Sequence, residues 1–570
     1  MLWSGVGDHP PDTTVSRGIG GYRVDDRPSV VAELEPAFEP AIVPAARRSG
    51  LGVWLVVVSA LIPLAPILIF SHPALSDYQN HLARLWLLTH GAPTPFYSVD
   101  WRHITGDMGV DLVAWSLGPV ASTQVIGRIC LAAAFLLPPL GAVVLNRRLF
   151  GGWGPYQAII PFFAWTLTGL AGFLNFQIGL GLALMFAAMD PALQSRGPWL
   201  GAAARCVCGA VLFFDHGLAL LFYALLLAGS TFGETGLGAP GPASARRMGS
   251  AVLAALTCLI PVILVTLVSH IAPGNRQPPG PSSLYVWNTA RSAMMAMASP
   301  LITYNLAADA GLAALAAASL AFAARVGRVR LHIGLLSVAL VLLALSAFMP
   351  DSTPQGGWTD RRLPVMALFA GLAAVRMSFP GRRRAAAAFA LAALALVGGR
   401  TAWIGWNWRA AQGLTDAVST ALASARPGAR ILPVQHQPTE AEFSAAPPGR
   451  FIFRHEPAYR HLAALAIPQR GAFVPTLFAQ RGVHPIRVNP PWDQIAFVEG
   501  GDLASVNALA NPALAPPSAP YVRLWRTRFD YVLVVNADYP DRNGPEVLPA
   551  GLTLVRDTGF AKLLRIDAAR

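Results

Sequence analysis

Apolar residues along the chain gather into long runs, and short polar connections separate one run from the next. An α-helix needs about 20 apolar residues to cross a bilayer, so runs near this length indicate membrane spans. The pattern predicts a polytopic all-α membrane domain of about 11 transmembrane helices over residues 47–400. The predicted spans are 51–71, 121–146, 155–173, 176–190, 198–213, 217–231, 249–270, 307–324, 332–349, 362–378 and 385–399.

Arginines are concentrated in alternate connections between these spans. Cytoplasmic connections of membrane proteins carry the excess of basic residues, so the alternation indicates the topology. It places a polar, disordered tail, residues 1–46, in the cytoplasm and residues 401–570 on the other side of the membrane. The arginines that set the alternation are Arg47, Arg48, Arg147, Arg148, Arg196, Arg246, Arg247, Arg325, Arg328, Arg330, Arg376 and Arg382 to Arg384.

The region after residue 400 has a different pattern, in which strand-like pieces alternate with helical stretches and with Pro and Gly. Such alternation is typical of an α/β domain. Residues 401–570 are therefore predicted to form a small C-terminal extracytoplasmic α/β domain that begins with a helix at 409–424. Its predicted strands are 430–434, 450–453, 472–478, 485–488, 531–535, 552–555 and 562–566, with a helical stretch near 458–466.

The composition agrees with a membrane protein, because 54% of the 570 residues are hydrophobic and only 13% are charged. Soluble domains carry about 25% charged residues, so a soluble enzyme, a disulfide scaffold and a disordered protein are excluded. The net charge is +13, but the arginines lie at the ends of apolar runs, which favours membrane lipid over nucleic acid as a partner. Lys562 is the only lysine. This preference for arginine suggests a GC-rich bacterium, and hence an inner-membrane protein with a periplasmic domain.

The polar segment after the first predicted span holds the first candidates for chemistry. Asp77 lies a few residues beyond the membrane exit, and a helix would place His81 and Arg84 on the same face. A carboxylate in apolar surroundings can act as a general base toward a hydroxyl group. The alternative is that Asp77 caps a helix and that His81 and Arg84 lie among lipid headgroups.

A second acidic pair follows in the same outside loop, residues 72–120. Asp107 and Asp111 are four residues apart in an amphipathic stretch that is too short to span and should lie at the membrane surface. Carboxylates at such a surface can hold a divalent metal beside a phosphate, so a metal is a possible cofactor and no other cofactor is indicated. The sequence has no GxxxxGK[ST] motif, so a nucleotide-driven pump is not supported.

An aspartate just after the first span, followed by Tyr78, a helix face with His81 and Arg84, and a second amphipathic helix, resembles the GT-C superfamily of membrane glycosyltransferases. Protein O-mannosyltransferases and lipid A aminoarabinose transferases are members. The resemblance covers the arrangement of most of the chain and is best over 72–118. It implies transfer of a sugar from a polyprenyl-phosphate carrier to an extracytoplasmic acceptor, with Asp77 as the catalytic base.

The same resemblance implies that His72 and Tyr78, which flank Asp77, line the site. Some members carry a second acidic residue in the outside loop between the third and fourth spans. Residues 173–177 occupy that place here and contain no acid. This departure from the family pattern argues against a dependence on metal.

Two further polar pairs interrupt apolar stretches. Arg361 and Arg362 lie in a short outside loop, against the charge rule, where two guanidinium groups can clamp the donor phosphate. The alternative is an interfacial pair beside the end of a span. Asp215 and His216 lie between two spans, where ionisable residues are often functional, although an ordinary polar turn explains them equally well. Asp77, Asp215 and His216 together are a further candidate set for a metal.

Two outside regions are candidates for acceptor binding. The 272–306 loop contains aromatic and amide side chains, and the C-terminal domain contains the cluster Tyr459-Arg460-His461. Aromatic rings stack on sugars and amides bond to hydroxyls. Interfacial anchoring explains the loop as well, and ordinary surface residues explain the cluster.

These patterns together favour an inverting glycosyltransferase that uses a polyprenyl-phosphate-linked sugar and a saccharide, lipid or protein acceptor of the cell envelope. Two other hypotheses stay open. One is a transporter or flippase of a lipid-linked saccharide, which needs polar residues at mid-bilayer depth. The other is a non-catalytic subunit of polysaccharide assembly, in which the C-terminal domain binds the partner.

Overall fold

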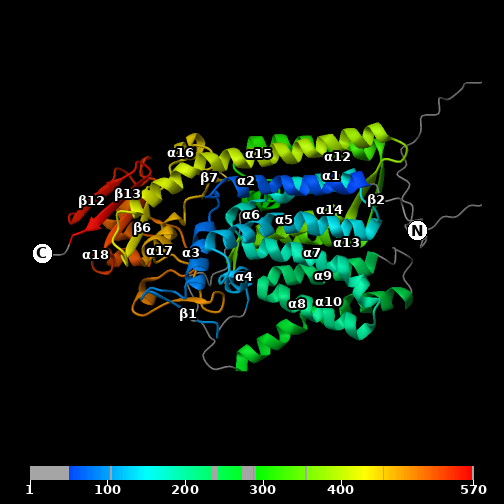
Figure 1. Ribbon diagram of the computed structural model, residues 1–570, viewed down its shortest axis with the longest axis horizontal. Helices are drawn as coiled ribbons and strands as arrows, with labels where there is room; N and C mark the ends of the chain where they lie inside the picture. The colour runs from blue at the N-terminus through cyan, green and yellow to red at the C-terminus, as the bar shows by residue number, and fades with distance from the viewer. Residues whose placement is uncertain are drawn as a thin grey trace, which may run out of the picture. The chain divides into compact units, whose positions relative to one another are not determined.

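Long apolar helices run side by side and form the helical domain of the molecule (Figure 1). The residues described by this computed structural model are 50–102, 106–233, 242–271, 287, 290–353, 356–453 and 455–567. The predicted tail, residues 1–46, lies outside them, as do residues 272–286 and 288–289 of the predicted 272–306 loop. The helices of this domain are α1 (Gly50–Leu61), α2 (Ala65–Ile69), α5 (Thr123–Phe150), α6 (Leu167–Ala171), α7 (Leu174–Gln194), α8 (Pro198–Asp215), α9 (Gly217–Gly233), α10 (Pro242–Ile271), α11 (Ala290–Met297), α12 (Leu306–Val326), α13 (Ile333–Ser346), α14 (Thr359–Ala374) and α15 (Arg383–Leu422), with the 3-10 helices η1 (Ile62–Leu64) and η2 (Pro155–Ala164).

Seven helices in the described part of the chain are long and apolar enough to cross a membrane. They correspond to the predicted spans that begin at residues 51, 121, 176, 198, 249, 307 and 385. The chain is therefore a multi-pass membrane protein. The predicted spans 217–231 and 332–349 correspond to α9 and α13, which are apolar but shorter, so the predicted count of 11 spans is not confirmed.

The predicted span 155–173 is wrong as a single membrane helix. The chain forms η2 there, turns at Trp165 and continues into the short helix α6, which Thr166 caps by accepting a hydrogen bond from the Gly169 amide. Most of these side chains are buried inside the helical domain. The run is apolar because protein surrounds it, and hydropathy alone does not distinguish burial in protein from contact with lipid.

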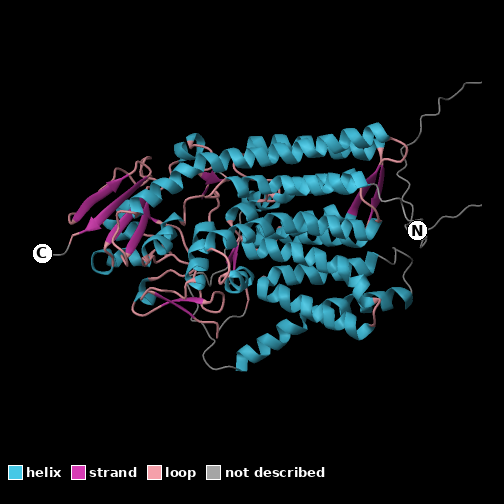
Figure 2. Ribbon diagram, viewed as in Figure 1, coloured by secondary structure: helices cyan, strands magenta, loops and turns pink. Residues whose placement is uncertain are grey.

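The predicted span 362–378 also ends early. α14 stops at Ala374, and the chain continues as strand β5 (Val375–Ser378), which pairs antiparallel with β2 (Arg328–Leu331). Figure 2 shows this small sheet at one end of the helices and the main sheet at the other end. A two-residue hairpin, β3 (Ser352–Thr353) and β4 (Gly356–Gly357), precedes α14.

Small residues let the central helices α5 and α7 approach closely. A Cβ atom on Gly141 of α5 would lie 2.6 Å from the carbonyl oxygen of Gly181 on α7, and a Cβ on Gly181 would lie 2.7 Å from the carbonyl oxygen of Leu137. Close backbone contact of this kind drives helix packing where lipid removes the hydrophobic driving force. Both helices belong to one buried apolar core with η2, α9 and α14.

The C-terminal region has strands at most of the predicted positions and is built around a five-stranded sheet of order β10-β6-β11-β13-β12. β10, β6 and β11 are parallel, whereas β13 and β12 are antiparallel additions. β6 and β11 are buried along their whole length, as expected of central strands covered on both faces. The sheet strands are β6 (Ile431–Gln435), β10 (Ala504–Ser505), β11 (Tyr531–Val535), β12 (Leu552–Asp557) and β13 (Ala561–Ile566).

The remaining predicted strands differ from the structure. The prediction of a strand at 472–478 is wrong, because only Phe473 forms a bridge, to Arg430. The predictions at 450–453 and 485–488 correspond to β7 (Phe451–Ile452) and β9 (Ile486–Val488), which pair outside the main sheet, β7 with β8 (Glu456–Pro457). The helical segments of this domain are α16 (Glu440–Ala445), η4 (Leu462–Leu465), α17 (Ala466–Arg470), η5 (Trp492–Ile495), η6 (Val506–Leu509), η7 (Pro512–Leu514), η8 (Pro520–Leu524) and α18 (Trp525–Arg528).

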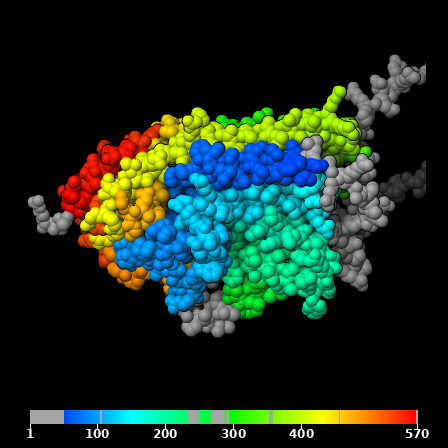
Figure 3. Space-filling model, in the orientation of Figure 1, coloured from blue at the N-terminus to red at the C-terminus, as the bar shows by residue number. Residues whose placement is uncertain are grey.

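The loop between α2 and α5, here called the first loop, packs against the C-terminal domain. It contains α3 (Tyr78–Thr89), β1 (Tyr97–Val99) and α4 (Gly109–Leu117), and β1 pairs antiparallel with β9. The Tyr97 hydroxyl bonds to both backbone groups of Val474, at 3.0 and 2.9 Å. In Figure 3 the blue surface of this loop lies against the orange surface of the C-terminal domain.

One continuous helix, α15, leads from the helical domain into the C-terminal domain. The predicted domain boundary at residue 400 falls within it, and the predicted helix 409–424 corresponds to its last part, which ends at Leu422. Its C-terminal part buries Val418, Ala421 and Leu422 in the apolar core of the C-terminal domain, which also contains Ala83 and Leu87 of α3. The C-terminal domain is therefore joined to the rest of the protein by two packed contacts, one with α15 and one with α3 of the first loop.

We expect Gly181→Val to destabilise the protein by about 1–3 kcal/mol, because the added methyl groups collide with the α5 backbone. Thermal unfolding of the purified protein in detergent measures the change. Gly311→Ala in α12 is the matched control, because a Cβ there meets no atom within 4 Å. Equal unfolding midpoints for the two variants would show that the α5–α7 contact is not tight.

Candidate active site

A cavity of about 410 Å³ lies between the helical domain and the C-terminal domain. The side chains that line it from the helical domain and the first loop include Asp77, His81, Asp107, Phe173, His216 and Arg362. The C-terminal domain contributes Arg460, Phe478, His484, Phe497, Glu499 and Asp502, among others. Five candidate residues of the helical domain and the first loop therefore meet at one cavity, together with Arg460 of the C-terminal cluster, although they come from separate segments of the chain.

Asp77 is the residue that precedes α3, and its side chain makes no capping hydrogen bond. Its backbone is fixed instead, since the Asp77 amide donates to the Ala171 carbonyl at 3.0 Å. Gly172, with φ +98°, lies directly against it, and a Cβ there would be 2.9 Å from the Asp77 Cβ. The carboxylate is thus held at the cavity wall by backbone contacts, and its oxygens are not used to cap α3.

Arg362 lies in the first turn of α14, and its guanidinium packs 4.4 Å from the centre of the Phe173 ring. Its Nη1 is 3.1 Å from Nε2 of His216. No carboxylate of the described residues lies within ion-pair distance of Arg362. Burial and the nearby Arg362 lower the pKa of His216 well below its usual value, so this imidazole is neutral. The arrangement leaves a positive charge at an aromatic wall, which suits an anionic ligand.

Asp107 reaches the cavity from a tight turn with φ +56°. Asn175 fixes this turn, because its Nδ2 donates to the Asp107 carbonyl at 2.7 Å and to Oδ1 at 3.0 Å. Its Oδ1 accepts from the amide of Val110 at 2.8 Å. Burial raises the pKa of Asp107. Segment 173–177 therefore has no acidic residue of its own, but its Asn175 holds Asp107 in place.

His81 lies one helical turn beyond Asp77. Its Nε2 is 3.1 Å from the Gly172 carbonyl, and its ring meets Phe478 edge-on. Burial, followed by the charge of Arg84, lowers the pKa of His81 to about 3. His81 is therefore neutral and can donate to the Gly172 carbonyl.

Arg84 and Asp111 do not line the cavity and form a buried ion pair with each other. Nε of Arg84 is 2.7 Å from Oδ1 of Asp111, and both side chains are fully buried. Burial raises the pKa of Asp111 to about 6, although Arg84 acts in the opposite direction. The pair joins α3 to α4 and so holds the two helices of the first loop together.

The other candidates also lie away from the cavity lining. Asp215 lies behind it, against Gly109 and Gly179. The backbone of His72 bonds to the Gln412 side chain, and Tyr78 packs against Gly127 of α5. Arg361 contacts Asp351 at 3.5 Å and stacks over Trp358 at 4.2 Å.

The C-terminal domain contributes cavity residues, and neighbours of these residues, that the sequence did not single out or explained equally well as ordinary surface residues. Arg460 bonds to Glu456 and to Asp502, both at 2.9 Å. Burial raises the pKa of Glu456. His461 contacts Asp77, with Nε2 3.4 Å from Oδ1. The polar cluster Tyr459-Arg460-His461 was a signal in the sequence, whereas no pattern pointed to Glu499 or Asp502.

The described residues contain no group of three or more His, Cys, Asp or Glu side chains placed to hold a metal ion. Asp77 and Asp107 line the same cavity, but Asp215 points into packed backbone rather than into the cavity. These residues do not form a recognisable ligand set, so we assign no step to a metal.

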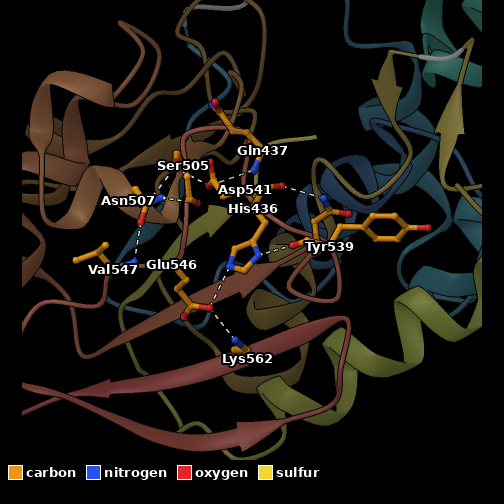
Figure 4. Close-up of polar contacts among 11 residues, drawn as sticks. His436, Gln437, Ser505, Asn507, Tyr539, Asp541, Glu546, Val547 and Lys562 are labelled. Carbon is orange, nitrogen blue, oxygen red and sulfur yellow. Dashed lines mark hydrogen bonds and ion pairs between the residues drawn. The ribbon is translucent and has the colours of Figure 1, made fainter. Parts of the chain in front are cut away.

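A second polar cluster lies at the carboxyl ends of the parallel strands β6 and β10 (Figure 4). Ser505 donates to Oδ2 of Asp541 at 2.6 Å. His436 contacts the Tyr539 carbonyl through Nδ1 at 2.6 Å and Glu546 through Nε2 at 3.2 Å, and Lys562 bonds to the same Glu546 oxygen at 2.7 Å. These side chains are bonded to one another and none lines the cavity. The cluster therefore joins β6, β10 and β13 to the connection between β11 and β12.

In comparisons with known proteins, no family model and no curated protein sequence matches the chain. One solved structure similar to this chain is the crystal structure of ArnT from Cupriavidus metallidurans in the apo state, with 11% sequence identity and a TM-score of 0.49. The match covers 91% of this chain and 99% of that chain. Similarity at this level assigns neither a family nor an activity.

We expect Arg84→Met to destabilise the protein by about 3–5 kcal/mol, because it leaves Asp111 buried without its cation. The double variant Arg84→Met, Asp111→Leu should recover most of the loss. Thermal unfolding in detergent measures both. Arg102→Met, which removes an exposed partner of Asp100 in the same loop, is the control and should change little. A double variant no more stable than Arg84→Met would contradict the pairing.

The His436–Glu546 pair predicts a pH dependence of stability. Burial lowers the pKa of His436, but the contacts with Glu546 and the Tyr539 carbonyl outweigh it and raise the pKa above the usual 6.5. The hydrogen bond from His436 is the largest of the effects that lower the pKa of Glu546 to about 2. The contribution of His436 to the free energy of unfolding is complete below pH 6.5 and is lost as pH rises through the raised pKa of His436. The Glu546 contribution is complete above pH 4.5 and is lost as pH falls toward 2.

His436→Gln should therefore lower the unfolding temperature more at about pH 5.5 than at about pH 8.5, because only the protonated imidazole forms the ion pair. Thermal unfolding of wild type and variant at the two pH values tests this. Exposed His90 provides the control variant His90→Gln. A difference that grows with rising pH would have the wrong sign and would refute the assignment.

Proposed function

We propose that the protein is a membrane glycosyltransferase that moves a sugar from a polyprenyl-phosphate donor to a hydroxyl group of an extracytoplasmic acceptor. The observation that carries the proposal is the placement of Asp77 and Arg362 on one cavity, with no carboxylate of the described residues paired to Arg362. A base and a free cation are the two groups that such a transfer requires.

The proposed reaction is a single displacement. Asp77 accepts the proton of the acceptor hydroxyl while the hydroxyl oxygen attacks the anomeric carbon of the donor sugar. The bond between this carbon and the phosphate oxygen breaks, and polyprenyl phosphate leaves with the electron pair. Attack from the face opposite the phosphate inverts the anomeric configuration. The proton ends on the Asp77 carboxyl and is later released to water.

Arg362 offsets the negative charge that grows on the leaving phosphate. A guanidinium suits this task because its planar N–H groups match phosphate oxygens. The Arg362 side chain packs on Phe173 and is 5.7 Å from the centre of the Phe176 ring, so the phosphate would meet it at an apolar wall where the charge interaction is strong. Arg361 is already engaged with Asp351, so we assign it no contact with the phosphate.

The lining of the C-terminal half suits a polyhydroxylated acceptor. Phe478 and Phe497 offer apolar faces to sugar rings, and Asp502 offers an acceptor oxygen for hydroxyl groups. In a bacterial inner membrane this half would lie in the periplasm, where saccharides, lipids and proteins of the cell envelope are available. The proposal requires no nucleotide and no nucleic acid.

The test is transfer by purified protein in liposomes, with a panel of polyprenyl-phosphate sugars and cell-envelope acceptors. Asp77→Asn should lower kcat by about 10²- to 10⁴-fold, because the amide cannot accept the proton. Arg362→Gln should lower kcat by about 10²- to 10³-fold, because the leaving group loses a charged donor. The exposed residues Asp493 and Arg523 provide the matched controls Asp493→Asn and Arg523→Gln, which should keep full activity.

The possible outcomes of this assay separate the proposed function from the alternatives. Full activity of Asp77→Asn would remove Asp77 as the base while keeping the enzyme class. If wild type transfers no sugar from any donor of the panel, the proposed function is refuted for these donors. Movement of a labelled lipid-linked sugar across the same liposomes, without transfer, would then support a flippase.

A further inference from the structure

The imidazole of His461 lies between Asp77 and Asn80 and belongs to the C-terminal domain, far from both in the sequence. Its Nε2 is 3.4 Å from Oδ1 of Asp77, and its Nδ1 is 3.3 Å from Nδ2 of Asn80. The His461 side chain is only 1% exposed. The two contacts together determine which ring nitrogen carries the proton.

The orientation of the Asn80 amide is fixed by backbone groups of the C-terminal domain. Its Oδ1 accepts from the Phe478 amide at 2.8 Å, and its Nδ2 donates to the Thr476 carbonyl at 2.8 Å. The opposite orientation would place the NH₂ group against an N–H and the carbonyl oxygen against another carbonyl oxygen. Asn80 is fully buried, so water does not relieve such contacts.

The fixed amide in turn selects the tautomer of His461. Nδ2 of Asn80 only donates, and its second hydrogen faces Nδ1 of His461. Nδ1 must therefore be the unprotonated nitrogen, and the ring proton must be on Nε2. A proton on Nδ1 would face the NH₂ group of Asn80 instead of an acceptor. The Nε2–H group faces Asp77.

The position of the ring is fixed by packing as well. The Phe478 ring meets the His461 ring edge-on, with centroids 5.1 Å apart, and Phe478 also meets His81. At Gly500, which has φ +70°, a Cβ would lie 3.0 Å from Cε1 of His461. These contacts leave the imidazole little freedom to turn away from Asp77.

We propose that His461 is a positioning residue for Asp77, an inference that rests on the proposed function of Asp77 as the base. The Nε2–H group of His461 bonds to Oδ1 of the carboxylate and leaves Oδ2 to accept the proton of the acceptor hydroxyl. His461 neither gains nor loses a proton in the reaction. The 3.4 Å contact is long for a hydrogen bond, and such contacts often shorten when substrate binds.

This arrangement gives the C-terminal domain a role in the chemistry. Asp77 and Asn80 belong to the first loop, whereas His461, Thr476 and Phe478 belong to the C-terminal domain. The carboxylate is oriented only when the two are docked. The C-terminal domain therefore completes the site as well as lining it.

The tautomer is tested without any activity measurement. Nitrogen-15 NMR of the full-length protein with labelled histidine distinguishes Nε2–H from Nδ1–H rings, and the His461 signal is the one lost in His461→Gln. We expect the Nε2–H form in wild type and a shifted Nε2 signal in Asp77→Asn. Asn80→Asp should produce the Nδ1–H form or the imidazolium, because a carboxylate accepts from Nδ1. An Nδ1–H ring in wild type would overturn the proposal.

The transfer assay tests the consequence for catalysis. His461→Gln keeps an N–H donor near the place of Nε2 and should retain kcat within about tenfold. His461→Leu removes it and should lower kcat by about 10²-fold with little change in KM, because a base displaced by about 1 Å costs that much. His90→Leu, on the exposed end of α3, is the control. Equal kcat for His461→Leu and His461→Gln would overturn the positioning role.

The two measurements keep this inference separate from the proposed function. If wild type transfers no sugar from any donor, the proposed function fails, and the NMR result alone decides whether His461 orients Asp77. If wild type is active but His461 has the Nδ1–H form, the enzyme class stands and the positioning role falls. A loss of folding in His461→Leu would appear in thermal unfolding, and His461→Gln and Asn80→Asp would then decide the question.

Discussion

The cavity depends on the docking of the first loop onto the C-terminal domain. The contact combines a short antiparallel pairing of β1 with β9, the hydroxyl of Tyr97 on the backbone of Val474, and the amide of Asn80 on the backbone around Phe478. Apolar side chains of α3 are buried in the same core as the main sheet. Backbone hydrogen bonds between the two parts set their register, and apolar burial supplies most of the free energy. Asp77 directly precedes α3, so this docking places it.

Charge is distributed unevenly around this contact. Buried Arg84 is paired with Asp111, and buried Arg450 is paired with Glu442 at 3.3 Å and with Asp538. A buried ion pair costs desolvation but is strongly favoured over a single unpaired charge. Arg362, in contrast, faces the cavity with a neutral histidine and phenyl rings as its neighbours. The scaffold thus neutralises these buried charges, whereas Arg362, at the cavity wall of the described part of the chain, is available to a ligand.

The sequence predicted the membrane helices where an apolar run meets lipid, and failed where protein provides the apolar surroundings. α5, α7 and α12 agree with the predicted spans within a few residues, because their length and flanking polar residues are distinctive. Residues 155–173 have the same composition but are buried as η2 and α6. The C-terminal strands β6 and β11 lie at the predicted strands 430–434 and 531–535, whereas β10, only two residues long, was not predicted.

The sequence by itself determined that the chain has apolar helices able to span a membrane, a strand-containing region after them, and conspicuous ionisable residues near the ends of apolar runs. It nominated Asp77, His81, Asp107, His216 and Arg362 within separate segments, because a charge or imidazole beside an apolar run is costly and therefore noticeable. Only the tertiary structure decided that these five line one cavity, that Arg84 and Asp111 satisfy each other, and that His461 completes the surroundings of Asp77. The physical reason is that helix periodicity relates residues within one turn or two. Contacts between the first loop and the C-terminal domain depend on packing between parts of the chain that no local pattern connects.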